Sequence, residues 1–511
     1  MNIASRIRAI AALSCTAVLA VLTACGGGGG GTAGASFNGS RGNGTYSVGG
    51  IVTGLAANSA VTLVNNGGDA IAVTANGSFA FASGVASGGA YAVTVQSHTP
   101  GVACSVGNGS GAVGSAAITN VAVTCGAGAL QILHAFDGSP SSVDGQSPSS
   151  TLVADSSGNL YGTTQGGGTS GQGTIFKITP GGSFSVIYNF TGGTGGANPY
   201  AGLVIDSAGN LYGTTYADGV ISSPCAIPNT PSPGVTPAGC GTVFKVSSVT
   251  GNLLWTYSFD GSPSGGARPS GGLAMDSTGN MYGTTSGDGT SGSGTVFRVT
   301  QSGTVTPIYT FASVDIFDGI NPYGTLLIDA QGNLYGTTYG GGMNGAGTIF
   351  KMTSGGSRTW LYSLDRVAGD GQKPYGGLLM DSTGNMYGTT YSGGTNDDGT
   401  VFKITASGVH SVIHSFDSSA PLKEGKTPYG TLILDSLGNL YGTCSAGGAN
   451  GSGTVFKITP SGVHSVLYSF GASATDGIDP RGALLMDSAG NIYGTTFNDG
   501  TNGVGNVFKI D

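Results

Sequence analysis

Short stretches in which hydrophobic and polar residues alternate recur along the chain from residue 46 onward. In residues 91–96, Tyr91, Val93 and Val95 fall on one side of the alternation. This pattern predicts β-strands, because successive side chains of a strand point to opposite faces. Turn sequences rich in Asn and Gly separate the stretches, which is typical of hairpins. The pattern therefore predicts an all-β protein.

The first group of predicted strands forms a domain of its own over residues 46–126. Its alternating runs cover residues 51–55, 60–64, 70–73 and 78–82, with hairpin turns such as Ala75-Asn76-Gly77 between them. Several short strands joined by hairpins predict a small antiparallel β-sandwich. The stretch resembles the immunoglobulin-like domains of bacterial surface proteins, and the role expected for it is that of a spacer.

The rest of the chain is one repeat, present seven times. Its motif is Asp-x-x-Gly-Asn-(Leu/Met/Ile)-Tyr-Gly-Thr, and the copies follow one another at steps of 51, 70, 53, 52, 54 and 52 residues. The copies begin at Asp155, Asp206, Asp276, Asp329, Asp381, Asp435 and Asp487. Each is followed by a Gly-(Thr/Asn)-(Ile/Val)-Phe-(Lys/Arg) segment and then by a strand that ends in aromatic residues.

Each repeat unit therefore supplies four short strands, which we name a, b, c and d in chain order. A period near 50 residues with four strands per unit predicts a β-propeller with seven blades over residues 127–511. The seventh unit lacks strand d, whereas residues 130–136, ahead of the first unit, form an unassigned strand d. We expect this N-terminal strand to pair with residues 506–510 and to close the ring. A linear solenoid would gain nothing from such an offset.

The repeats resemble the bacterial tandem-repeat proteins called GloVer, named for their occurrence in Gloeobacter and Verrucomicrobia. The Gly-Asn-Leu-Tyr-Gly-Thr-Thr and Gly-Gly motifs carry the resemblance over residues 128–511. It implies an exported protein with a variable anchor, and it implies no particular activity.

The composition excludes several other classes of protein. Glycine accounts for 99 of the 511 residues, and charged residues make up only 8%. So much glycine disfavours helices, because each Gly in a helix interior costs about 1 kcal/mol relative to Ala. The absence of a three-residue glycine period excludes collagen. A net charge of −8 offers no basic surface for nucleic acid.

The N-terminus is predicted to be an export signal. Arg6 and Arg8 precede an apolar stretch over residues 9–22, which is too short to span a bilayer about 30 Å thick. The following Leu-Thr-Ala-Cys run resembles the bacterial lipobox, which implies a signal peptide over residues 1–24 and a lipid on Cys25. Residues 25–45 form a Gly-rich tether. The alternative is an ordinary cleaved signal with an incidental cysteine.

This resemblance implies an exported protein held to the bacterial cell envelope. Residue 26 is Gly rather than Asp, which we take to indicate the outer membrane. The lipid would be the chain's sole contact with the membrane.

The cysteines of the mature chain fit an oxidising compartment. Cys104 with Cys125 and Cys225 with Cys240 form two local pairs that lack the close spacing of a zinc site. We predict a disulfide for each pair, the alternative being buried free thiols. Cys444 replaces the second Thr of its motif and is expected to be a small buried residue.

The motif residues are interpreted as structural. An Asp and a Gly between strands a and b are typical of a hairpin turn, and the Gly after Tyr allows close packing. His134 and His414 occupy the Tyr position of strand d. His410 and His414 lie about 13 Å apart along one strand, which is too far to chelate one metal.

Seven basic residues share one position of strand c, and we expect them to lie near the seven turn aspartates. They are Lys177, Lys245, Arg298, Lys351, Lys403, Lys457 and Lys509.

The loops between strands d and a are the predicted ligand face. Five of them carry an acid before Gly, namely Asp144, Asp318, Asp370, Glu424 and Asp476. The same face receives the long Pro-rich insertion of the second unit, residues 216–241. We therefore expect ligand contact here. No cofactor is predicted, and Ca²⁺ bound between the loop acids is the alternative. The simplest interpretation is that the loop is inert and its acids are solvated.

The sequence favours a monomeric binding or scaffold protein whose partner is a glycan or an envelope or extracellular protein. No nucleophile elbow or phosphate-binding loop is present. The alternative is a secreted polysaccharide-active hydrolase or lyase that uses Asp and Tyr residues around the channel. Carboxylates converging in the channel would favour that enzyme.

Overall fold

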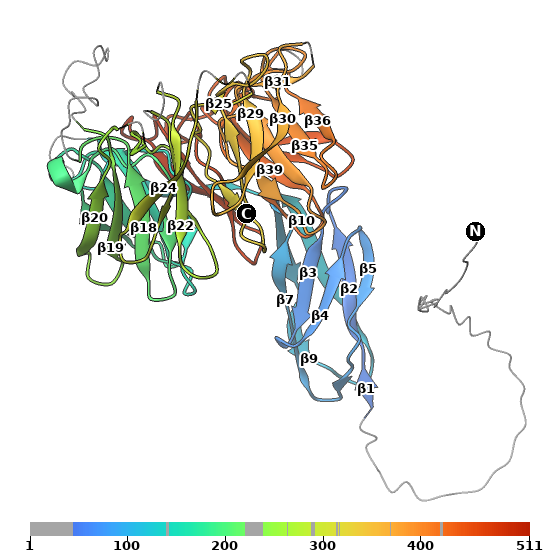
Figure 1. Ribbon diagram of the computed structural model, residues 1–511. Helices are drawn as coiled ribbons and strands as arrows, with labels where there is room; N and C mark the ends of the chain where they lie inside the picture. The colour runs from blue at the N-terminus through green and yellow to red at the C-terminus, as the bar shows by residue number, and fades with distance from the viewer. Residues whose placement is uncertain are drawn as a thin grey trace, which may run out of the picture. The chain divides into compact units, whose positions relative to one another are not determined.

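The computed structural model describes residues 44–138, 143–219, 239–262, 264–287, 292–312, 315, 317–367, 369–419 and 423–511. Within this range the chain forms β-strands and one short 3₁₀ helix, η1 (Gly193–Gly195). Figure 1 shows the N-terminal strands in blue and the repeat units from cyan to red. The prediction of an all-β protein is confirmed. The signal peptide, the tether up to residue 43 and Cys25 lie outside the described residues.

The N-terminal region contains two four-stranded sheets around one core. Its strands are β1 (Thr45–Tyr46), β2 (Val48–Thr53), β3 (Val61–Asn65), β4 (Asp69–Val73), β5 (Gly77–Ala80), β6 (Val85–Ala86), β7 (Ala90–His98), β8 (Val102–Gly107), β9 (Ser110–Ala112) and β10 (Ile118–Ala127). The sheet orders are β5-β2-β10-β8 and β4-β3-β7-β9. Alternate residues of both sheets, such as Val52, Leu63 and Val123, are fully buried in the shared core.

One pairing in this region differs from the expected antiparallel arrangement. Strand β10 runs parallel to β2, with Val123 opposite Val52. The two strands are the second and the last of the region, so no tight hairpin forces them to be antiparallel. On its other side β10 pairs antiparallel with β8, and this register places Cys125 opposite Cys104. These two cysteines form the predicted disulfide.

The repeat region forms one sheet per unit with strands in the order a-b-c-d, and a short loop strand adds a fifth to the sheets of units 1 and 6. Strand a is β13 (Val153–Ala154), β17 (Val204–Ile205), β21 (Ala274–Met275), β26 (Leu327–Ile328), β32 (Leu379–Met380), β38 (Ile433–Leu434) and β42 (Leu485–Met486) in units 1 to 7. Strand b is β14 (Leu160–Gly166), β18 (Asn210–Thr215), β22 (Met281–Thr285), β27 (Leu334–Thr338), β33 (Met386–Thr390), β39 (Leu440–Ala446) and β43 (Ile492–Thr496). Strand c is β15 (Thr174–Ile178), β19 (Thr242–Ser247), β23 (Thr295–Val299), β29 (Thr348–Met352), β35 (Thr400–Ile404), β40 (Thr454–Ile458) and β44 (Asn506–Ile510).

Strand d completes each sheet, and that of unit 7 comes from the N-terminal side. It is β16 (Phe184–Asn189), β20 (Leu253–Ser258), β24 (Val305–Thr310), β30 (Arg358–Ser363), β36 (His410–Ser415), β41 (His464–Ser469) and β11 (Leu130–Ala135). Short strands in the loops are β12 (Gln146–Pro148), β25 (Gly319–Ile320), β28 (Gly340–Gly341), β31 (Gly371–Gln372), β34 (Ser392–Gly393) and β37 (Lys426–Pro428). These tie the d–a loops to the segments that follow strand b.

The turn between strands a and b owes its shape to the motif aspartate. In unit 5, Oδ1 of Asp381 accepts hydrogen bonds from the backbone N–H groups of Thr383 and Asn385 at 2.9 Å. Its Oδ2 accepts from the side chains of Asn385 and Tyr387. Burial alone would raise the pKa of this carboxyl, but the hydrogen bonds outweigh it and lower the pKa. The Asp–Tyr bond occurs in all seven units, so the structural interpretation is confirmed.

The motif tyrosine lies between the turn aspartate and the basic residue of strand c. Tyr212 is directly opposite Lys245 in the strand pairing, and Lys245 Nζ lies 5.0 Å from the centroid of its ring. The hydroxyl of the same tyrosine donates a hydrogen bond to the Asp206 carboxylate at 2.9 Å. Among the described residues, none of the turn aspartates forms an ion pair within 4.0 Å of these basic residues. The expected Asp–Lys proximity is thus realised through the aromatic ring rather than as ion pairs.

The glycine and threonines of the motif pack the sheets together. A Cβ atom added at Gly336 would lie 2.6 Å from Phe350 Cζ, so only glycine fits beside this buried ring. The second threonine bonds to strand c within the same unit, as in the 2.8 Å contact of Thr338 with Thr348. The hydroxyl of this threonine therefore adds a hydrogen bond between strands b and c. Cys444 takes this place in unit 6 and is a buried free thiol, as predicted.

The first threonine of the motif links each unit to the next. Its hydroxyl donates to a carbonyl just before strand a of the following unit, over 3.1–3.5 Å. The donors are Thr163, Thr214, Thr337, Thr389, Thr443 and Thr495. Thr284 is the exception, since its buried hydroxyl has no partner among the described residues.

The last of these links returns to the first unit. Thr495 of unit 7 donates to the carbonyl of Ser150 at 3.3 Å. Strand β11 pairs antiparallel with β44, with Leu130 opposite Ile510, so the predicted pairing of these segments is confirmed. Phe136 follows β11 and is fully buried against Phe176 of unit 1. The N-terminal strand thus takes part in the packing between the last unit and the first.

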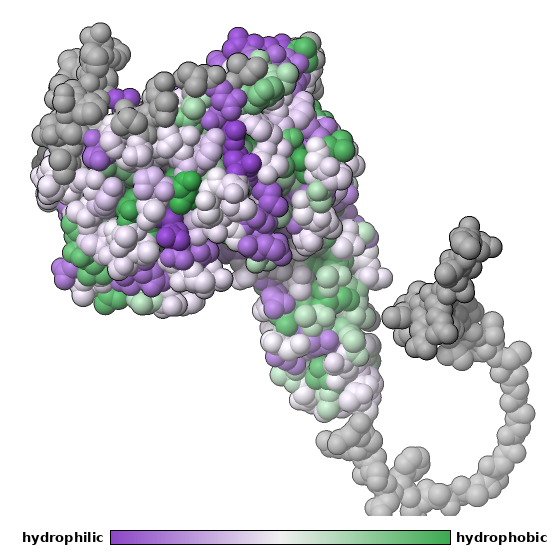
Figure 2. All heavy atoms as spheres, in the orientation of Figure 1, coloured by the Kyte–Doolittle hydropathy of each residue, from purple (hydrophilic) through white to green (hydrophobic). Residues whose placement is uncertain are grey.

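The surface matches the low charge of the sequence. On the face shown in Figure 2, residues of intermediate hydropathy predominate and hydrophobic ones are scattered. Among the described residues, no helix has the length and the apolar character needed to cross a bilayer.

Candidate functional site

Seven equivalent segments, one from each unit, border one shallow cavity of the repeat region. Each comes directly before strand a and has the sequence X-Pro-(Tyr/Ser/Arg), as in Asn198-Pro199-Tyr200. The residue before proline has a positive φ in every unit, between 54° and 61°. Such a conformation is uncommon for residues other than Gly, and its sevenfold repetition shows that the repeat imposes it. The seven residues are Ser147, Asn198, Arg268, Asn321, Lys373, Thr427 and Asp479.

The proline fixes this turn against the preceding unit. A Cβ atom at Gly173 of unit 1 would lie 2.7 Å from Cδ of Pro199, and one at Gly505 of unit 7 would lie 2.8 Å from Cδ of Pro148. The glycine before strand c therefore leaves room for the proline of the next unit. The residue after the proline borders the shallow cavity in every unit.

Four of these seven positions carry tyrosine, and their side chains converge. The hydroxyls of Tyr200 and Tyr429 lie 2.7 Å apart although they come from units 2 and 6. Tyr375 stacks on Tyr323 with ring centroids 4.7 Å apart and contacts Tyr429 at 4.0 Å. We call Tyr200, Tyr323, Tyr375 and Tyr429 the tyrosine cluster. Burial raises the pKa of Tyr323, Tyr375 and Tyr429, so these hydroxyls stay protonated at neutral pH.

More aromatic rings surround the cluster on the loops that follow strand b. Tyr339 lies edge-on to Tyr323 with centroids 5.5 Å apart, and Tyr391 lies 6.4 Å from Tyr429. Cationic side chains stack on this outer set. Lys373 Nζ is 5.8 Å from the Tyr339 centroid, and the guanidinium of Arg481 is 3.9 Å from that of Phe497.

The cluster and the segments beside it line two cavities on the axis. A shallow one of about 70 Å³ is bordered by residues of all seven units, including the four tyrosines and Arg481. A second, of about 260 Å³, is lined by Leu, Ile, Ala, Thr and Gly residues such as Leu273 and Leu432. Among the described residues, the lining of neither cavity includes Asp, Glu, His or Cys. The site can therefore stack and hydrogen-bond a ligand, but it holds no acid–base pair.

Sequence reasoning missed this cluster. The signal was present as a Pro-Tyr-(Gly/Ala) segment in four units, but the predicted ligand face was based on the acids of the same loops.

The five loop acids lie elsewhere, at the junctions between adjacent units. Each faces the aromatic or histidine side chain at the fifth position of the preceding strand d. The pairs are His134 with Asp144 (3.0 Å), Tyr309 with Asp318 (3.0 Å), Tyr362 with Asp370 (3.2 Å), His414 with Glu424 (2.8 Å) and Tyr468 with Asp476 (2.7 Å). Most of these acid side chains are buried or nearly buried; the Asp318 side chain is only 2% exposed. Each of the five carboxylates is engaged within its own junction, and ligand contact by these acids stays a prediction.

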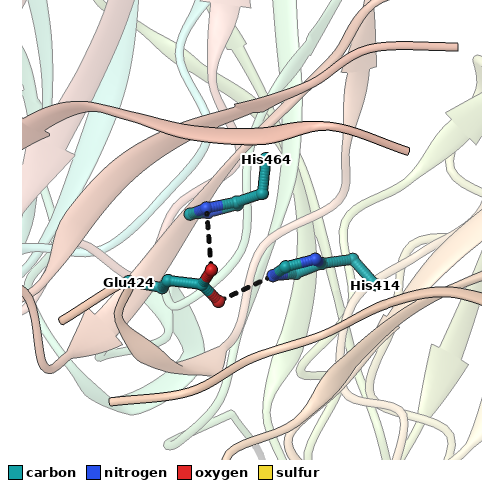
Figure 3. Close-up of side chains that lie close together, drawn as sticks. All are labelled: His414, Glu424 and His464. Carbon is teal, nitrogen blue, oxygen red and sulfur yellow. Dashed lines mark hydrogen bonds and ion pairs between the residues drawn. The ribbon is translucent and has the colours of Figure 1, made fainter. Parts of the chain in front are cut away.

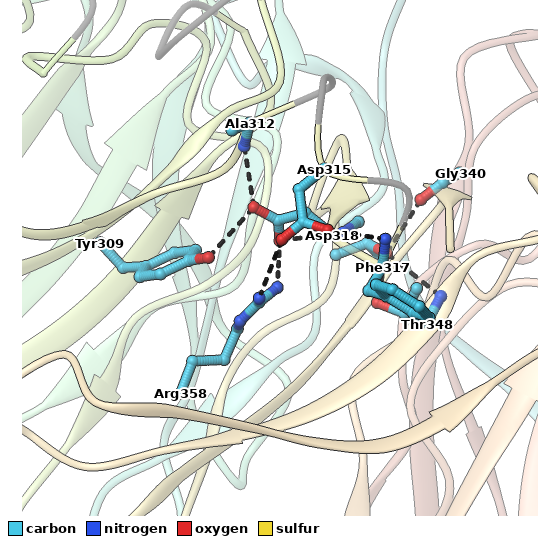
Figure 4. A network of polar contacts seen from close by, with 10 residues as sticks. Tyr309, Ala312, Asp315, Phe317, Asp318, Gly340, Thr348 and Arg358 are labelled. Atoms are coloured by element: carbon cyan, nitrogen blue, oxygen red, sulfur yellow. Dashed lines mark hydrogen bonds and ion pairs between the residues drawn. The ribbon is translucent and has the colours of Figure 1, made fainter. Parts of the chain in front are cut away.

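The junction of units 3 and 4 illustrates how such an acid is held (Figure 4). Oδ2 of Asp318 accepts from Tyr309 at 3.0 Å and from the backbone N–H of Ala312 at 2.9 Å. Arg358 of the next unit pairs with Asp318 and lies 3.6 Å from Asp315. Burial raises the pKa of Asp318 although these donors favour its charged form. Here the loop acid serves as a local anchor for the loop.

The predicted insertion of unit 2 falls mostly outside the described residues. Residues 220–238, which include Cys225, are not described. Cys240 is buried and disulfide-bonded. Ligand contact at this insertion stays a prediction.

The repeat region matches a known protein family. The model of a family described as the Gloeobacter/Verrucomicrobia repeat matches residues 91–223, 230–423 and 420–511. No curated protein matches the chain.

Among solved structures the similarity is distant. A putative 6-phosphogluconolactonase from Bacteroides uniformis is 16% identical with a TM-score of 0.42, covering 66% of this chain and 88% of its own. One from Bacteroides fragilis is 17% identical with a TM-score of 0.40, covering 72% and 97%. BamB from Moraxella catarrhalis is 13% identical with a TM-score of 0.40, covering 71% and 85%. These likenesses are too remote to bear on function.

Proposed function

The chain belongs to the Gloeobacter/Verrucomicrobia repeat family, and from that premise we propose that it is an exported, lipid-anchored protein that binds glycans at the tyrosine cluster. The single observation that carries this proposal is the convergence of four tyrosines from four different repeat units on one axial cavity.

A seven-bladed β-propeller is the architecture proposed for residues 127–511. Seven sheets with strands in the order a-b-c-d, the pairing of β11 with β44 and the bond from Thr495 to Ser150 support it. For residues 46–126 we propose an immunoglobulin-like β-sandwich that serves as a spacer, supported by two sheets around one core. Lipid on Cys25 and the tether over residues 25–45 would hold this assembly at the cell envelope, with the outer membrane as the proposed location.

The chemistry of the cluster fits sugar rings. Tyrosine offers an apolar ring face together with a polar hydroxyl, so it can pack against the C–H face of a sugar and bond to its hydroxyls. The half-buried rings of Tyr200 and Tyr429 are already held by neighbouring aromatic rings and by each other. Preorganised groups lose less conformational entropy on binding, which favours affinity.

A hydrolase or lyase is disfavoured by the same site. Glycoside hydrolysis generally needs two carboxyl groups that flank the scissile bond. Among the described residues, the two axial cavities are lined by none. The loop acids are engaged by strand d and the backbone at separate junctions.

The test is a glycan array followed by calorimetry on the chain from residue 45 onward, which forms one compact unit. We expect Tyr429→Ala to weaken binding of the best glycan by about tenfold, the equivalent of one aromatic contact of about 1.4 kcal/mol. Tyr429→Phe removes the hydroxyl alone and separates its contribution from that of the ring.

Tyr257→Phe is the matched control, because Tyr257 lies on the outer strand β20 and does not line the cavities. It should leave affinity unchanged. Unchanged affinity in a folded Tyr429→Ala variant would place the ligand elsewhere, and an array without any glycan binding would overturn the glycan proposal in favour of a protein partner.

A further inference from the structure

Four of the junctions between adjacent units share one pattern on their outer strands. The fifth residue of strand d in one unit stacks on the first residue of strand d in the next, above the loop acid that joins them. The centroid distances are 3.6 Å for His134 and Phe184, 3.9 Å for Tyr362 and His410, and 4.5 Å for His414 and His464. At the junction of units 3 and 4, Arg358 takes the place of the second ring and lies 5.2 Å from Tyr309.

The junction of units 5 and 6 combines two features that the other junctions of this kind do not share. Both stacked residues are histidine, His414 and His464. The acid between them, Glu424, is the only glutamate of the chain, whereas the four other loop acids are aspartates. Because the repeat supplies the same backbone at every junction, the other units serve as internal references. They show that neither a second histidine nor a longer acid is needed to build the junction.

The three side chains converge on a small volume (Figure 3). Nε2 of His414 lies 2.8 Å from Oε2 of Glu424, and Nδ1 of His464 lies 3.5 Å from Oε1. One ligand atom from each residue lies within 4.8 Å of the other two. The three side chains are between 6% and 14% exposed, which leaves them mostly shielded from water.

The contacts inside this group leave the histidines incompletely paired. The 3.5 Å separation of His464 from Glu424 is longer than an ordinary hydrogen bond. Nε2 of His464 is buried and has no hydrogen-bond partner among the described residues. Imidazole nitrogens are common metal ligands in proteins.

We propose that His414, Glu424 and His464 form a binding site for a divalent first-row transition metal ion, with Zn²⁺ as the best fit. Two histidines and one carboxylate are a common protein ligand set for zinc, with a fourth position for water. Ligand atoms about 2.1 Å from a tetrahedral ion lie about 3.4 Å from one another. The two His–Glu spacings bracket that value, and the stacked imidazole rings would turn out of parallel to point both nitrogens at the ion.

Such an ion would join two units and the loop between them. His414 belongs to β36 of unit 5, His464 to β41 of unit 6, and Glu424 to the connecting loop. The site is separate from the tyrosine cluster, so the proposal is independent of glycan binding. A bound ion would stabilise this junction against opening, because only the folded chain brings the ligands together.

The test is metal titration of the chelator-treated chain by calorimetry, with Zn²⁺ and then Co²⁺ as probes. We expect one Zn²⁺ per chain and a rise in melting temperature on binding. His464→Phe and His414→Tyr should each weaken Zn²⁺ binding by more than about 100-fold and abolish the visible absorption of bound Co²⁺. Both replacements occur naturally at equivalent positions, as Phe184 and as Tyr362, so the variants are expected to fold.

His134→Tyr is the control, since it makes the corresponding change at the junction of units 7 and 1. It should leave stoichiometry and affinity unchanged. The proposal is overturned if the parent chain binds no Zn²⁺, or if the double variant His414→Tyr/His464→Phe binds it as tightly as the parent. It is also overturned if His134→Tyr removes the ion.

Discussion

Phe136 tests whether the N-terminal strand is an integral part of the repeat region. The side chain is fully buried and packs against Phe176 and Phe184 of unit 1, with centroids 5.3 and 5.8 Å away. Phe190 occupies the equivalent position between units 1 and 2, is equally buried, and contacts Phe244 at 5.1 Å. Removing a buried phenylalanine side chain costs about 3–5 kcal/mol. We therefore expect Phe136→Ala and Phe190→Ala to lower the free energy of unfolding by similar amounts within that range.

The assay is chemical denaturation of the parent and both variants, monitored by tryptophan fluorescence and circular dichroism. Equal slopes with a shifted midpoint would indicate a change in stability alone. The reasoning fails if Phe190→Ala costs the expected amount while Phe136→Ala costs less than about 1 kcal/mol. In that case β11 would contribute little to the stability of the repeat region.

Three further predictions follow from the repeated contacts. Because hydrogen bonds lower the pKa of six of the turn aspartates, Asp155, Asp206, Asp276, Asp329, Asp381 and Asp487, the unfolded chain takes up protons first as pH falls, so stability should decline below about pH 4; Asp381→Asn should lower stability at pH 7 and flatten the acid decline measured by denaturation. Gly336→Ala should destabilise the chain by about 1–3 kcal/mol, since the new methyl group meets Phe350, and Phe350→Leu in that background should restore part of the loss; no loss would refute the packing argument. Cys444→Thr should raise the free energy of unfolding by about 0.5–1.5 kcal/mol by restoring the hydrogen bond to strand c. A decrease in the free energy of unfolding would show that the buried surroundings of Cys444 fit sulfur better than threonine.

The architecture could be predicted from the sequence because each repeat contains the residues that form its own turns. Asp381, Gly384 and Asn385 specify the hairpin locally, and the offset of one strand implies the pairing of β11 with β44. The parallel pairing of β2 with β10 was missed, because no local sequence signal records which distant strands become neighbours.

The candidate sites depend on contacts between units, and these were harder to predict. His410 and His414 were correctly excluded as a chelating pair, since they lie along one strand. The actual neighbour of His414 is His464, 50 residues later, because equivalent strands of successive units lie side by side. Comparing each strand d with the next one would have exposed this pair. Similarly, Tyr200 and Tyr429 are 229 residues apart in the chain, and their hydroxyls come within 2.7 Å of each other only in the folded repeat region.

The pairing of β11 with β44 also sets an order for folding. Most strand contacts in the repeat region close loops of a few tens of residues, such as Thr338 with Thr348, whereas Gln131 and Asp511 are 380 residues apart. Loop-closure entropy makes the long-range contact about 3 kcal/mol more costly to initiate than a ten-residue one. The sheets should therefore assemble first as an open arc that exposes two unpaired edges. During that interval a second copy can add to either edge, so the rate of closure should determine how much newly made protein escapes aggregation.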